Sequence, residues 1–206
     1  MPTLAADRVL RTIPNGLRIV VVEDHEAPAV FVRVLLPRGE NDDPAGKAGV
    51  SDIAADLVQK GAGARDADGM AELVDGLGAE LAGSSGAEYT LIGCNALSQH
   101  LDTAIELTRD MVFAPKMETR EFALIKDQTL GGIKAQRSNP SYLAAIHLPP
   151  AVFGPDVPQG NVKTEGSLNK ISIEDVRAYQ RGCLQAAGAI ALCIGDVDAS
   201  GVAAKL

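Results

Sequence analysis

Residues 8–22 read RVLRTIPNGLRIVVV, and this stretch decides the class of fold. Its two aliphatic runs flank Asn15-Gly16, which is a strong signal for a tight hairpin because both residues accept positive φ. A third run of alternating side chains follows soon afterwards. The chain therefore opens with three strands, which we expect to pair as a meander: Arg8 to Ile13, Leu17 to Val22 and Ala29 to Leu36.

The hydrophobic period then changes from that of a strand to that of a helix. Val50, Ile53, Ala54, Leu57 and Val58 fall at i, i+3, i+4, i+7 and i+8, which forms one apolar helical stripe. Further helices are predicted over residues 70–77, 98–112, 118–137, 140–153 (kinked or ended at Pro149-Pro150) and 172–185, the last opened by a capping box of Ser172 and Asp175. Further strands are predicted over residues 79–83, 88–95 and 189–197, and a loop over residues 154–166.

Strands and helices are thus clustered along the chain rather than alternating. This order favours an α+β fold, with a mainly antiparallel sheet and helices packed on one face. Neither a repeat nor a low-complexity linker divides the sequence, so residues 1–206 are predicted to form a single domain.

Charge and composition exclude several classes of partner. The chain has 19 Lys and Arg residues against 27 Asp and Glu residues, a net charge of −8, so nucleic acid and anionic membranes are poor partners. No apolar run is long enough for a membrane span, and the N-terminus lacks the pattern of a secretory signal. The three cysteines, Cys94, Cys183 and Cys193, form no CxxC pair and are expected to be small buried hydrophobic residues.

Several short motifs, in order along the chain, resemble the N-terminal domain of the pitrilysin/insulinase family of zinc peptidases, which includes the mitochondrial processing peptidase. The resemblance extends over roughly residues 8–198, and each motif is weak alone whereas the ordered set is specific. The motifs are NGLRIVV (15–21), DPAGKAGV (43–50), KGA (60–62), LGAEL (77–81), TEGSL (164–168) and GDV (195–197). The resemblance implies a metalloprotease-like α+β domain, which is normally one part of a longer two-domain subunit.

The chemistry of that family uses an inverted zinc motif, H-x-x-E-H, on the first helix, with a third ligand, a glutamate, on a later long helix. Two His at i and i+4 share a helix face and bind zinc, while the Glu serves as general base. The resemblance places these positions on Asp52, Ala55, Asp56 and Gly132. All four family residues are substituted, so these positions are vestigial, and no catalytic residue, metal ligand or zinc cofactor is expected.

Other residue types do not restore the site. His25, His100 and His147 have no second ligand at metal-binding spacing, and Ser84 and Ser85 have no His nearby in the sequence. Asp52 and Asp56 at i, i+4 suit a hard cation only with further oxygen ligands, which their neighbours lack. The alternative is that Asp52 complements the dipole of the helix and Asp56 is solvated.

The resemblance therefore implies a catalytically inactive homologue that acts as the partner or scaffold half of a clamshell metallopeptidase. Its expected partner is a catalytic family homologue, or a second copy of itself, with peptide substrate held in a shared chamber. Two alternatives remain: an active metalloendopeptidase with an atypical metal site formed by Asp52 and Asp56, and a purely structural subunit. Bacterial relatives suggest a periplasmic or extracytoplasmic location, and the sequence itself leaves the compartment open.

Overall fold

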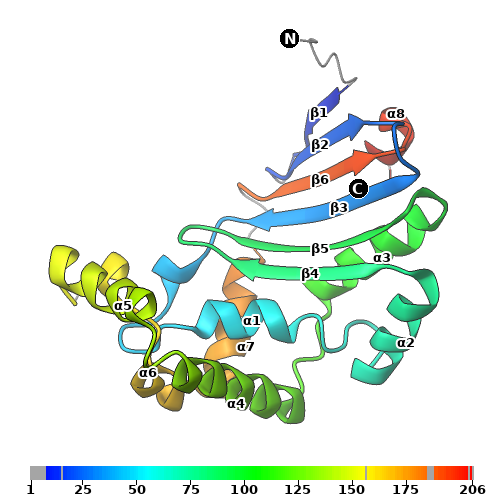
Figure 1. The fold of residues 1–206 in the computed structure, drawn as a ribbon. Coiled ribbons are helices and arrows are strands. Elements are labelled where there is room, and N and C mark those ends of the chain that lie inside the picture. Colours follow the sequence, from blue (N-terminus) through cyan, green and yellow to red (C-terminus); the bar gives the residue numbers. More distant parts are fainter. Residues whose placement is uncertain (1–7, 15, 156, 185–187, 204, 206) are drawn as a thin grey trace.

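The computed structural model describes residues 8–14, 16–155, 157–184, 188–203 and 205. Six strands form one sheet in the order β1-β2-β6-β3-β5-β4 (Figure 1). Their pairing is antiparallel except for the parallel pair β2 and β6, which confirms the predicted α+β class with a mainly antiparallel sheet. The strands are β1 (Arg8–Thr12), β2 (Arg18–Glu23), β3 (Ala29–Leu36), β4 (Glu80–Ser85), β5 (Thr90–Leu97) and β6 (Ile190–Gly195).

The prediction of an N-terminal meander is wrong in one respect. The β1–β2 hairpin forms, although Asn15 of its turn lies outside the described residues, but β6 lies between β2 and β3. β6 is apolar on both faces, and a position with a strand on each side also satisfies its backbone donors and acceptors. The local sequence favoured pairing of β2 with β3, which follows it in the chain. Burial of the apolar last strand, β6, between them decided the strand order instead.

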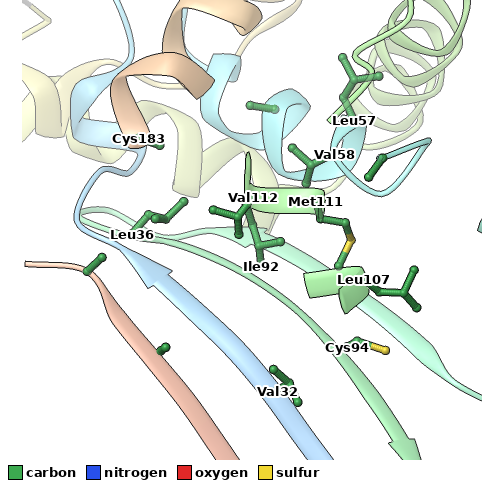
Figure 2. Packing of buried hydrophobic residues seen from close by; sticks show 14 of the residues in the cluster. Val32, Leu36, Leu57, Val58, Ile92, Cys94, Leu107, Met111, Val112 and Cys183 are labelled. Carbon is green, nitrogen blue, oxygen red and sulfur yellow. The ribbon is translucent and has the colours of Figure 1, made fainter. Parts of the chain in front are cut away.

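The two faces of the sheet differ. Along β3, Val30, Val32 and Leu36 are buried, whereas Phe31 on the opposite face is 45% exposed. The buried face packs on α3 (Leu101–Phe113), whose Leu107 is fully buried in the cluster that Figure 2 shows. The other described helices that contact the sheet join the same hydrophobic core, as expected for helices on one face.

The remaining helices are α1 (Val50–Leu57), α2 (Ala67–Leu77), α4 (Thr119–Ala135), α5 (Pro140–Phe153), α6 (Glu165–Lys170), α7 (Ile173–Cys183) and α8 (Ala199–Ala203). Of these, α1, α4, α5, α6 and α7 gather beyond the β4 edge, whereas α8 lies against β1 and β2 (Figure 1). Two short helices, α6 and α8, were not predicted, and α6 begins inside the stretch expected to be a loop because Thr164 caps it through a hydrogen bond from the Ser167 backbone.

Local signals at helix ends were reliable where the side chains themselves form the cap. Ser172 and Asp175 make the predicted capping box at the start of α7, with the Ser172 backbone N–H donating to Asp175 at 2.8 Å. Gly78, at φ +60°, ends α2 in the left-handed conformation. By contrast, α5 does not end at Pro149-Pro150, because none of its residues is buried and the carbonyls that lose a partner can meet water.

The three cysteines are free and buried, as predicted. Burial raises the pKa of each thiol to about 11. Within the described part of the chain, no helix has the length and apolar character that a membrane crossing requires.

Candidate vestigial metal site

The N-terminus of α1 is fixed by a buried carboxylate. Asp43 accepts hydrogen bonds from the backbone N–H groups of Gly49, at 2.6 Å, and Ser51, at 2.8 Å. Burial raises the pKa of Asp43, while these two hydrogen bonds oppose the shift. Gly49 itself has φ +106°, a conformation that side-chain-bearing residues rarely adopt. These contacts set the direction of α1 relative to the preceding loop and therefore the positions of Asp52, Ala55 and Asp56.

The other end of α1 packs against the β4 edge of the sheet. Ala55 is 1% exposed, and its carbonyl accepts a hydrogen bond from Gln59 Nε2 at 3.0 Å. Gly83 of β4 lies so close that a Cβ built on it would be 2.1 Å from the same carbonyl oxygen. The resemblance places the general base at position 55, and here that position carries a buried methyl group with no proton acceptor.

Asp52, on the first turn of α1, forms an ion pair with Lys163. Lys163 comes from the segment between the 3-10 turn η3 (Pro158–Gly160) and α6, 111 positions further along the chain. The side chains are 24% and 39% exposed respectively, so the pair is partly shielded from water. The fold thus places an ammonium group against Asp52, the residue at the position that the resemblance assigns to the first zinc ligand.

The charges of Asp52 and Lys163 also act on two further carboxylates, Glu40 and Asp56. The pKa of Glu40, in the 3-10 turn η1 (Glu40–Asp42), is raised by desolvation and then by Asp52, and Lys163 opposes the shift. The pKa of Asp56 is likewise raised by desolvation and then by Asp52, although its side chain reaches solvent. Lys163 is therefore the ammonium that pairs with Asp52, and it also opposes the pKa shifts of Glu40 and, together with Lys60, of Asp56.

Gly132 lies on α4, which packs against α1. The fold therefore brings together the two helices that carry the four vestigial positions. Gly132 is exposed, and a Cβ built there would have no neighbour within 4 Å. A glycine offers no side-chain ligand, and the open space shows that nothing has filled the place of the larger residue.

The residues present do not fit a zinc ion. The set holds two carboxylates, and one of them, Asp52, is already paired with Lys163. Among the described residues, no group of three or more His, Cys, Asp or Glu side chains is suited to hold a metal ion. The three histidines lie in separate parts of the fold: His25 in the loop between β2 and β3, His100 in the turn before α3, and His147 on α5. His25 is instead hydrogen-bonded to Asp196 at 2.7 Å. The expectation of no catalytic residue or metal ligand stays a prediction, and it is consistent with this arrangement.

A hollow of about 480 Å³ lies between α1, η1 and α5. Its polar wall includes Glu40, Asp43, Asp52 and Lys163. Its apolar wall, on α5, is formed by Tyr142, Ala145, Ile146 and Pro149. Sequence reasoning identified Asp52 but missed Lys163 and Glu40, because no local motif links residues that only the tertiary fold brings together.

Comparisons with known proteins identify the family of this chain. Residues 18–156 match the model of the insulinase family, peptidase family M16. The chain belongs to the M16 family. The recognition made from the short motifs is therefore confirmed.

Among curated proteins, the chain is similar to an uncharacterized zinc protease of Mycobacterium leprae, with 28% identity over 161 residues, 78% of this chain and 36% of the relative. It is also similar to a non-peptidase homolog of Helicobacter pylori, with 22% identity over 161 residues, 77% of this chain and 37% of the relative. The chain thus spans about a third of the length of these M16 relatives.

Two solved structures share the fold. A peptidase M16 inactive domain from Pseudomonas fluorescens superposes with a TM-score of 0.85 at 23% identity, covering 96% of this chain and 48% of that one. A protease from Helicobacter pylori gives a TM-score of 0.82 at 20% identity, covering 97% of this chain and 48% of that one. At these identities the likeness establishes the M16 architecture and nothing finer.

Proposed function

We propose that this M16 chain is the non-catalytic half of a clamshell metallopeptidase and supports a catalytic homologue that holds the zinc. The proposal rests on one observation, which is the packing of α1 together with the residues at its positions 52 and 55. The helix packs against β4, α4 and α7 within the M16 fold, yet Asp52 is paired with Lys163 and position 55 is a buried alanine. The family architecture is thus preserved while the groups that activate water are absent from these positions.

The surface of α5 supports the partner role. None of its 14 residues is buried, and none carries a permanent charge. Leu148 and Val152, one turn apart on the outer face, are each 62% exposed. An uncharged and mainly apolar helix with exposed side chains is normally covered by other protein, so α5 suits contact with a partner subunit. In Figure 1 it lies at the end of the molecule away from the sheet.

A second uncovered surface lies on the sheet. Phe31 and Leu10 point to the face opposite α3 and are 45% and 64% exposed. The share of each M16 relative that this chain covers also supports residues 1–206 as one domain of a longer two-domain subunit. Peptide would be held in a chamber that both halves line, and the hollow between α1 and α5 would face it.

Co-expression with an M16 homologue that has an intact H-x-x-E-H motif tests the proposal. We expect a stable heterodimer, and higher peptidase activity than the catalytic chain shows alone. Leu148→Asp should abolish both effects, because it places a charge in an apolar contact, whereas Leu124→Asp on α4, also an exposed leucine, serves as the matched control.

The same preparation separates the alternatives. Stoichiometric zinc and chelator-sensitive cleavage by this chain alone would refute the proposal and favour a peptidase with an atypical site. A complex that forms without any change in peptidase activity would favour a purely structural subunit. Failure to form a complex at micromolar concentration would also contradict the proposal.

A further inference from the structure

This chain differs most clearly from a zinc peptidase in the source of positive charge beside α1, which here is a lysine side chain. We propose that Lys163 is a tethered substitute for the metal ion: its ammonium holds α1 and the segment before α6 together by balancing the carboxylates of the vestigial site. This inference is independent of the partner role in the proposed function.

The position of the ammonium is built into the fold. Gly49, immediately before α1, leaves the space in which the aliphatic stem of Lys163 lies, because a Cβ there would be 3.0 Å from Lys163 Cδ. The same Cβ would be 2.9 Å from Leu168, which is fully buried in α6. The stem therefore lies against Gly49 at the start of α1, as does Leu168 of α6, and its charged end reaches Asp52.

The charges around the ammonium explain why it is needed. Desolvation is the main reason that the pKa values of Glu40, Asp43 and Asp56 are raised, and the charge of Asp52 raises each of them further. Lys163 acts in the opposite direction on Glu40 and, together with Lys60, on Asp56. In a zinc peptidase the bound ion supplies positive charge near this helix, whereas here a side chain that cannot dissociate does so.

The ammonium also ties together elements that are distant in the sequence. Asp52 is on α1, Glu40 is on η1, and Lys163 is 111 positions after Asp52. Nearby, Ser167 Oγ donates a hydrogen bond to the Ala48 carbonyl at 2.9 Å, which joins α6 to the loop that precedes α1. Metal ions in proteins often stabilise such long-range closures, and an ion pair can perform the same role without a ligand.

A double-mutant cycle on the purified chain tests this inference. Lys163→Met keeps the stem and removes the charge, and we expect the folding equilibrium constant to fall about tenfold because Asp52 then faces other carboxylates unpaired. Asp52→Asn should lower the constant in the wild-type background but raise it, about threefold, in the Lys163→Met background. Lys163→Arg should fold within about twofold of wild type, since it retains the charge.

Lys134→Met, on the exposed part of α4, is the matched control and should combine additively with Asp52→Asn. If Lys163→Met fails to fold, the double variant Lys163→Met/Asp52→Asn decides: a folded double variant supports the charge-balancing role. A double variant that is unfolded as well, or additivity of the two changes at Lys163 and Asp52, would overturn it, because a lysine that only packs through its stem shows neither rescue nor coupling.

Discussion

Gly83→Ala is the most direct test of the contact between α1 and β4 that positions the vestigial site. The new Cβ would lie 2.1 Å from the Ala55 carbonyl oxygen, whereas ordinary van der Waals contact begins at 3.4 Å. The strand and helix must therefore separate by about 1.3 Å. The clashing atom belongs to the backbone, so no rotation of a side chain relieves it.

The magnitude follows from two opposing effects. Overpacking of a tight contact costs roughly 1–3 kcal/mol, and here the upper part of that range applies because Ala55 is buried beside the core. Replacing glycine by alanine in a strand returns roughly 0.5–1 kcal/mol of backbone entropy. The free energy of unfolding should fall by about 2 kcal/mol, which lowers the Tm by about 5 °C in a chain of this size.

Urea unfolding followed by circular dichroism, with a thermal melt, measures this loss. Gly132→Ala is the matched control, because a Cβ there meets no atom within 4 Å and the position is inside α4. It should raise the free energy of unfolding by roughly 0.5–1 kcal/mol. Opposite signs for the two glycines support the packing of α1 on β4, and a Gly83→Ala variant as stable as wild type would refute it.

Three further predictions concern ionisable groups. The hydrogen bond that the His25 ring donates to Asp196 raises the pKa of His25, so its contribution to stability is present below the unfolded pKa and is lost as pH rises through the folded value. An NMR titration should show the raised pKa, and Asp196→Asn should return it toward 6.5. Burial tends to raise the pKa of Asp175, but the hydrogen bonds from Lys47 and Ser172 outweigh it and lower the pKa. The stability that Asp175 contributes is therefore present above its unfolded pKa and is lost as pH falls through the folded value. Asp175→Ala should lower the free energy of unfolding, measured by urea unfolding, by about 1–2 kcal/mol at neutral pH but by little near pH 2. The buried thiols should react with a disulfide reagent only after unfolding, and fast labelling of the native chain would contradict the packing of Cys94, Cys183 and Cys193.

Local sequence was most informative where one segment contains both the signal and its partner. The apolar stripe of α1 and the capping box of α7 were predicted because residues three or four positions apart lie side by side on a helix. The position of β6 in the sheet was not predicted, since the pairing of strands that are distant in the sequence depends on burial of the whole sheet. The helix α6 was missed because its cap lies in a stretch whose composition resembles a loop.

The amino-acid sequence alone determined the family, the α+β class and the loss of the zinc motif, because these depend on residue types at fixed spacing. Only the tertiary structure decided which residue pairs with Asp52, since Lys163 is 111 positions away and meets it beside the hydrogen bond that joins α6 to the loop before α1. An electrostatic contact between distant segments leaves no periodic pattern in the chain, whereas a helix face or a turn does.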